Sequence, residues 1–350
     1  MYESLGFTAL TAPQAAVAFA LLLGLVFGAL AERTRFCLRR ALVGNDRREA
    51  AGVWAVALAV AVAGTQVAIA AGWIAFDTHR LMATDLPILA ILLGGAVFGA
   101  GMVLTRGCAS RLTVLAGTGN MRAWLALLVF AVTAHAMLKG VLAPVRTALG
   151  SVTLPVGDAA SLAALPGGAA VWAALAILAA AALAVATRIR PGLALEGAAI
   201  GALVPLAWVG TGLVLYDDFD PIAMQGLSFT APWADSLFWT VAASAIPAGF
   251  GVGLVGGVIA GGLLSAAAAR RLAWQGFEGP AQTGRFMAGA VLMGAGGVLA
   301  GGCTVGAGLA GIPTLSVAAL LAFAAIMAGA LVTHALINGT AARGASVPAE

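Results

Sequence analysis

The stretch GGAVFGAGMVLTRGC at residues 94–108 returns, with its glycines and cysteine in register, as GAVLMGAGGVLAGGC at residues 289–303. Four glycines, a Val-Leu pair and the cysteine of the first copy each lie 195 residues before their counterparts. Paired apolar segments interrupted by glycine, one in each half of a membrane chain, are the best sequence pointer to a transporter's binding site. The repeat therefore predicts a two-part architecture in which Cys108 and Cys303 are equivalent.

The composition identifies an integral membrane protein. The chain is 62% hydrophobic and 9% charged, whereas soluble domains carry roughly 25% charged residues. Its mean hydropathy is +1.03. The first apolar stretch has no basic segment before it, so we expect a true span and not a cleaved signal peptide. The small excess of positive charge reports membrane topology, and nucleic-acid binding is not expected because no soluble basic face exists.

We expect an all-α membrane protein with about nine spans and short re-entrant helices. The spans are predicted at approximately 13–31, 50–76, 86–104, 121–142, 169–187, 193–214, 236–268, 286–301 and 314–337. Arginine-rich loops alternate with loops that are mixed or acidic, and the positive-inside rule then places the N-terminus outside and the C-terminus in the cytoplasm.

The spans divide into two halves around a connector. Residues 1–142 would form the first half, residues 143–192 the connector with the fifth span, and residues 193–350 the second half. An odd number of connecting spans inverts the second half, which predicts an inverted-topology repeat. With small gaps, Arg35-Phe36-Cys37 also falls opposite Ser228-Phe229-Thr230.

Each Gly-Cys segment is followed by a stretch rich in small residues, which we interpret as a re-entrant turn with a short helix behind it. Irregular backbone at that depth lines a path or is buried in protein. Glycine-rich turns and helix starts present backbone N–H groups to anions. We expect the N–H groups around residues 101–107 and 301–308 to serve an anion, and we place Gly107, Gly302, Arg106 and Thr304 on its path. Arg106 and Arg111, which flank Cys108, fix topology, form an electropositive exit that attracts anions, or do both.

The three cysteines, Cys37, Cys108 and Cys303, are the main candidates for chemistry. A membrane cysteine ordinarily packs as a small hydrophobic residue. Here none lies in the middle of a predicted span, two are equivalent in the repeat, and the third lies in another irregular segment. A thiol offers a weak donor and a soft sulfur acceptor, which suits a solute that contains soft sulfur. Metal-ligand spacing is absent from the sequence, so neither a metal nor a cofactor is expected.

Three motifs resemble the YeeE/YedE family of bacterial membrane proteins, whose characterised members import thiosulfate. They are GMVLTRGC at 101–108, GGCTVGAGLAG at 301–311 and RTRFCLRR at 33–40. The resemblance implies an hourglass-shaped transporter, not an enzyme, in which Cys37, Cys108 and Cys303 pass thiosulfate inward through S–H hydrogen bonds. It also suggests a small cytoplasmic TusA-like sulfur-carrier protein as partner.

Two alternatives stay open at this point. The family also has members linked to selenium metabolism, so a selenium compound or another sulfur species is a second candidate substrate. A membrane thiol enzyme or sulfur relay that uses a cysteine persulfide is a third reading, which needs an activated and accessible thiol. His135 and His334 lie within predicted spans, where a neutral imidazole that bonds to a backbone carbonyl is more common than a proton site.

Overall fold

The computed structural model describes residues 10–217 and 220–344, and this part of the chain contains nine helical segments long and apolar enough to cross a membrane. The predicted all-α class and the nine spans are thereby confirmed. The α-helices are α1 (Ala12–Arg33), α2 (Leu38–Val43), α3 (Arg47–Ala70), α4 (Ile88–Leu104), α5 (Ala109–Gly117), α6 (Met121–Lys139), α7 (Ala143–Gly150), α8 (Gly168–Thr187), α9 (Pro191–Val209), α10 (Thr230–Ala242), α11 (Phe250–Ala268), α12 (Pro280–Leu299) and α13 (Val317–Gly344).

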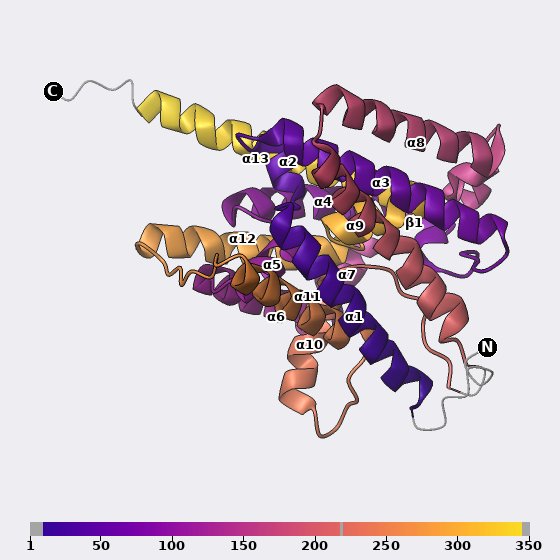
Figure 1. Cartoon of the computed structure of the whole chain (residues 1–350), viewed down its shortest axis with the longest axis horizontal. Helices are drawn as coiled ribbons and strands as arrows, with labels where there is room; N and C mark the ends of the chain where they lie inside the picture. Colours follow the sequence, from indigo (N-terminus) through magenta and orange to yellow (C-terminus); the bar gives the residue numbers. More distant parts are fainter. Residues whose placement is uncertain (1–9, 218–219, 345–350) are drawn as a thin grey trace.

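Shorter elements connect them. The short helices are η2 (Arg80–Met82), η3 (Gly157–Ala160), η4 (Leu162–Ala164), the π-helical η5 (Gly210–Val214) and η6 (Thr304–Gly311), and η7 (Ile312–Thr314). The strands β1 (Asp85–Leu86) and β2 (Leu154–Pro155) form one antiparallel pair. The helix α8, which corresponds to the predicted connector span, lies at the edge of the bundle against α3 (Figure 1).

One predicted span begins too early, since only Phe250–Ala268 of it is long and apolar enough to cross a membrane. The segment predicted as a single span at 236–268 consists of two helices, α10 and α11, separated by a non-helical turn. Pro247 and Gly249 lie in that turn. Proline lacks the N–H that a helix interior needs and disfavours helical backbone at the residue before it, so α10 ends early. The short α10 thus occupies the position in the second half that α2 occupies in the first.

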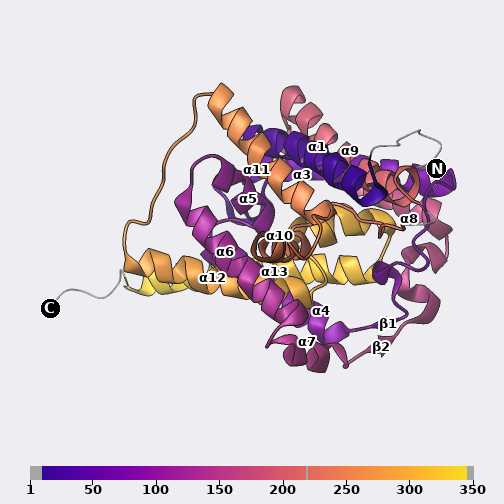
Figure 2. The same cartoon turned by 90° about the horizontal axis from the view of Figure 1, so that it is seen from below.

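The packing partners come in exchangeable pairs. We matched α1, α2, α3, α4, α5 and α6 of the first half, in this order, with α9, α10, α11, α12, η6 and α13 of the second. Most contacts between two of these helices then have a counterpart between the two helices that match them. The helix α1 packs on α11 as α9 packs on α3, and α4 packs on α13 as α12 packs on α6 (Figures 1 and 2). This arrangement is what two structurally related halves produce. Their inversion across a membrane stays a prediction.

The duplicated glycines allow α4 and α12 to cross at close range. A Cβ atom on Gly101 would lie 2.5 Å from the carbonyl oxygen of Gly289, and a Cβ on Gly289 would lie 2.8 Å from the oxygen of Gly101. Gly99 faces the backbone of α13, and Gly294 faces the backbone of α6. Small residues let helix backbones approach in membranes, and the repeat therefore builds the centre of the bundle.

Candidate functional site: a thiol cluster at converging helix starts

Each cysteine caps a helix that starts directly after another helix has ended. The three preceding helices are α1, α4 and α12, and the three following helices are α2, α5 and η6. Two residues before each cysteine the backbone is left-handed, with φ of 52° at Arg35, 57° at Arg106 and 74° at Gly301. One backbone pattern therefore positions all three thiols, and the short helices α5 and η6 confirm that helices follow the two Gly-Cys segments.

The first turn of a helix leaves backbone N–H groups without a partner in the helix, which favours nearby anions. The amide of Gly306 donates to the Cys303 sulfur at 3.4 Å, and the amides of Phe229 and Val305 also face that sulfur. The amides of Arg40 and Arg111 face the sulfurs of Cys37 and Cys108 in the same way, three residues after each cysteine. The backbone amides that could donate to an anion are therefore those of the first helical turn after each cysteine.

The predicted use of the preceding N–H groups is wrong for one segment. The amides of Thr105, Arg106 and Gly107 donate to the carbonyls of Gly101, Val103 and Met102, at 3.0, 3.2 and 3.1 Å, because they close the last turn of α4. The Arg106 side chain is exposed, whereas Gly107 is buried. Gly302 is buried in the equivalent turn, where a Cβ would lie 3.1 Å from the amide nitrogen of Ala307.

The three thiols gather in one place although 71 and 195 residues separate them along the chain. Cys37 and Cys108 interact directly, and Cys108 also interacts with Cys303 and Thr304. The Cys108 sulfur lies 3.2 Å from the Ser110 hydroxyl. All three cysteines are free and almost inaccessible, with exposed fractions of 4%, 1% and 0%.

Two threonine hydroxyls in the same region make no hydrogen bond of ordinary geometry among the described residues, although that of Thr304 approaches the Cys108 thiol. Thr304 follows Cys303, and Thr230 starts α10 at the position that matches Cys37. Both side chains are buried, at 0% and 4% exposure. A buried polar group without a partner is costly, so these hydroxyls are suited to a passing ligand. The alignment of Ser228-Phe229-Thr230 with Arg35-Phe36-Cys37 contained the signal for Thr230.

Aromatic side chains enclose the thiols, and one arginine reaches them. Phe36 stacks on Trp54 at 4.6 Å between ring centroids, and Phe27 contacts both Phe36 and Phe229. The Arg111 side chain donates to the Ala31 carbonyl at 3.2 Å and interacts electrostatically with both Cys37 and Cys108. Within residues 10–217 and 220–344, no group of three His, Cys, Asp or Glu side chains could hold a metal ion.

The two histidines within spans have other contacts. His135 stacks on Phe238 with ring centroids 4.9 Å apart. A ring nitrogen of His334 lies 3.0 Å from the Asn338 amide, one helical turn away on α13. His135 also interacts electrostatically with Asp235, whereas the His334 contact is local to α13.

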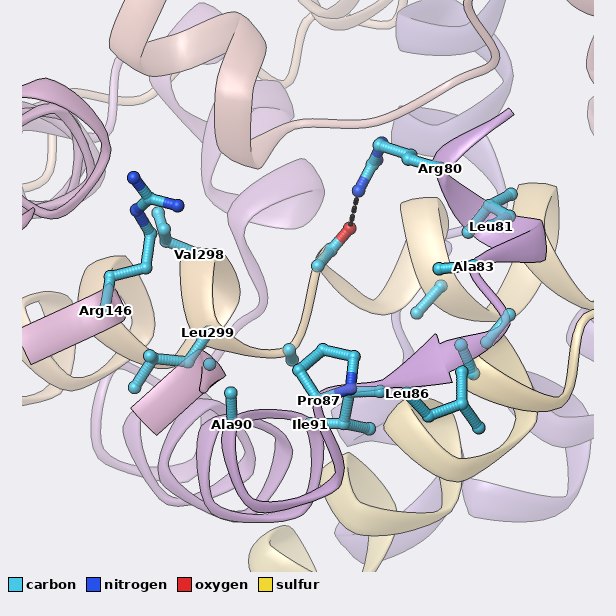
Figure 3. A pocket seen from close by; sticks show the side chains of 16 residues that line it. Arg80, Leu81, Ala83, Leu86, Pro87, Ala90, Ile91, Arg146, Val298 and Leu299 are labelled. Carbon is cyan, nitrogen blue, oxygen red and sulfur yellow. Dashed lines mark hydrogen bonds between the residues drawn. The ribbon is translucent and has the colours of Figure 1, made fainter. Parts of the chain in front are cut away.

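A cavity of about 330 Å³ lies at the end of α12 that leads to Cys303, and two arginines line it (Figure 3). The Arg80 guanidinium donates to the Gly301 carbonyl at 2.7 Å, and Arg146 donates to the Met137 carbonyl at 3.1 Å. Arg80 also borders a neighbouring cavity of about 530 Å³, whose wall includes His79, Ser228 and Gly306. The sequence analysis missed Arg80, because nothing in the loop 77–85 marks it as facing a cavity.

His79 stays neutral beside that cation. Burial, together with the charge of Arg80, lowers the pKa of His79 to about 4. Its Nδ1 atom accepts the Leu81 amide at 3.3 Å, and its ring packs edge-on against Phe76 and Trp208. At neutral pH the positive charge beside these two cavities therefore comes from arginine side chains and not from His79.

A family model described as Sulphur transport matches residues 33–332, which contain all three cysteine segments. The chain belongs to this sulphur transport family. The YeeE/YedE resemblance is thereby confirmed. Two curated relatives are each named Thiosulfate transporter TsuA. The one from Escherichia coli is 31% identical over 122 residues, 33% of each chain, and the one from Spirochaeta thermophila is 32% identical over 127 residues, 34% of this chain and 36% of the relative. The chain therefore aligns with about a third of each relative.

Proposed function

We propose that this multi-pass membrane protein carries thiosulfate, or a related anion with a terminal soft sulfur atom, across the bacterial inner membrane into the cytoplasm. The observation that supports this most is the meeting of three free thiols and two buried hydroxyls at the starts of four short helices. Helix starts and hydroxyls donate to oxyanion oxygens, and thiols match the polarisable sulfur.

The proposed path begins at Arg80. An anion that leaves water loses strong hydration, and the loss must be offset by donors at each stage. The two arginines of the 330 Å³ cavity supply the first donors, and η6 with Thr304 and Cys303 supplies the next. Cys108 and then Cys37 with Arg111 continue the path toward the opposite end of the bundle. Each contact is individually weak, which conduction through a series of sites requires.

The thiols act as hydrogen-bonding groups in this proposal, and no covalent bond forms. The side chains that adjoin Cys108 are other thiols, hydroxyls and an arginine, and none of them is a general base at neutral pH. A persulfide relay also needs a group that takes up and returns a proton, and the lack of one among these side chains favours passage. A TusA-like carrier that receives the ion in the cytoplasm belongs to the same proposal.

The test is uptake of radiolabelled thiosulfate by proteoliposomes that contain the wild-type chain, Cys108→Ala or Cys108→Ser. We expect uptake by the wild type, a loss of at least tenfold in Cys108→Ala, and partial activity in Cys108→Ser, since serine keeps a donor but loses soft sulfur. Equal uptake by all three at equal protein content would show that Cys108 only packs. Competition by selenite, sulfite and sulfide separates the alternative substrates, and a persulfide mass on Cys108 after incubation would support the relay instead.

A further inference from the structure

Three arginines from separate elements converge at the end of the α4–α12 pair that lies opposite Arg80. Arg39 belongs to α2, Arg106 to the turn after α4, and Arg285 to the first turns of α12. Arg39 interacts electrostatically with both other guanidinium groups and with the Cys37 thiol. We call these three residues the arginine triad. Through Arg39 the triad adjoins the end of the thiol cluster at which Cys37 lies.

The charges of the triad are not balanced within the protein. The Nε atoms of Arg39 and Arg285 are buried and have no hydrogen-bond partner, and none of the three residues takes part in a salt bridge among the described residues. Several other arginines of the chain do pair with carboxylates, as Arg40 does with Asp46 and Glu49. Guanidinium groups that gather without a carboxylate repel one another, and the repulsion is screened less where the groups are partly buried, as Arg39 and Arg285 are. A bound anion would relieve that repulsion.

Membrane topology alone does not account for this arrangement. The positive-inside rule explains arginines in loops on one side of the membrane, and exposed residues such as Arg47 and Arg48 satisfy it. It gives no reason for Arg39 and Arg285 to turn inward until their Nε atoms lose contact with water. Guanidinium groups present planar donor pairs that match the oxygens of a tetrahedral oxyanion.

We infer that Arg39, Arg106 and Arg285 form a distinct oxyanion site beside Cys37, which holds a divalent tetrahedral anion at the end of the path. The role of this site as the last binding site for thiosulfate on the path rests on the proposed function. Its affinity for an oxyanion does not depend on that function. The three guanidinium groups would hold the oxygens, while the Cys37 thiol faces the remaining atom. The phosphate headgroup of an anionic lipid shares this chemistry and is the second possible source of the ligand.

Sulfate is the probe of choice, because it has the oxygens of thiosulfate and no terminal soft sulfur. The measurement is the sulfate dependence of thermal unfolding for the purified full chain in zwitterionic detergent. We expect sulfate to raise the midpoint of the wild type and of Cys108→Ala alike, and its apparent affinity to fall at least tenfold in Arg39→Gln and Arg285→Gln. Arg48→Gln is the matched control, since it removes one exposed arginine near the same end of the bundle, and it should retain the wild-type response.

Loss of the response in the triad variants but not in Arg48→Gln supports the site, whether or not thiosulfate is transported. A response that is equal in all variants overturns it. Arg39→Lys, which keeps the charge, distinguishes a lost site from a misfolded protein: it should recover part of the affinity. Repeating the titration in nanodiscs with anionic lipid separates the sources, since a lipid headgroup in the site would abolish the sulfate response of the wild type there, whereas a site for a free ion would keep it.

Discussion

The crossing of α4 and α12 allows a quantitative test of how the repeat holds the thiols together. In Gly101→Ala, the new Cβ would lie 2.5 Å from the Gly289 oxygen and 2.8 Å from both the amide nitrogen and the Cγ of Met293. Ordinary contact begins near 3.4 Å, so the 2.5 Å contact must lengthen by about 0.9 Å. The obstacle is backbone of a packed helix, which cannot rotate away, and overpacking of this kind typically destabilises by about 1–3 kcal/mol.

The control is Gly256→Ala on α11, where a Cβ would meet no atom within 4 Å. Alanine is the better helix former by roughly 0.5–1 kcal/mol, so this variant should be as stable as the wild type or more stable. We expect the unfolding midpoint of Gly101→Ala, measured by scanning fluorimetry, to fall by about 2–8 °C relative to the control. Uptake should fall with it, because the turns that carry Cys108 and Cys303 follow the two helices that separate. Equal midpoints for the two variants would refute the role assigned to the repeated glycines.

Two further substitutions test the path and its mouth. Thr304→Val removes a buried hydroxyl that makes no hydrogen bond of ordinary geometry in the described chain, so stability should be retained. Thiosulfate uptake should fall by about 10–100-fold, which corresponds to the loss of one hydrogen bond to a charged ligand. Full uptake by the variant would show that Thr304 does not lie on the path. Burial and Arg80 lower the pKa of His79 to about 4, below its usual 6.5, so its stabilising contribution is complete above pH 6.5 and is lost as the pH falls toward 4. His79→Gln should flatten the wild-type decrease of the unfolding midpoint over that interval, and a wild-type midpoint that is constant there would contradict the assignment.

The sequence predicted the parts of the structure that the repeat encodes locally. The glycine spacing predicted paired segments, and the cysteines at equal positions within them predicted a shared site. Thr230 could be recognised only from the short match of its segment to that of Cys37. The helix α10 was not predicted as a separate helix, because apolar residues continue through the break at Pro247 into α11. Hydropathy measures preference for lipid and does not register a helix that ends inside a long apolar run.

Neither the arginine triad nor the pair of arginines at the 330 Å³ cavity could be predicted from the sequence, because only the packing of distant segments brings these side chains together. Arg39 and Arg285 are 246 residues apart, and each resembles an ordinary arginine at a membrane surface. Their convergence depends on α2 and the start of α12 lying at the same end of the bundle as the turn after α4. Arg80 faces the cavity because η2 directs its side chain toward the Gly301 carbonyl. Loop arginines carry no periodic signal that could have revealed either arrangement.

The two halves share a backbone pattern but differ in the charges and thiols placed on it. Across the 195-residue offset, Arg106 corresponds to Gly301 and Arg111 to Gly306, while Cys37 matches Thr230. Each difference adds a cation or a soft donor at the same end of the path. A passive path cannot set the direction of net flux, which follows the gradient, but unequal sites decide where an ion rests. In the proposed path this asymmetry would favour occupancy at the end predicted to be cytoplasmic, where consumption of the anion would draw it onward, while weaker binding at the opposite end would keep the entrance free for the next ion.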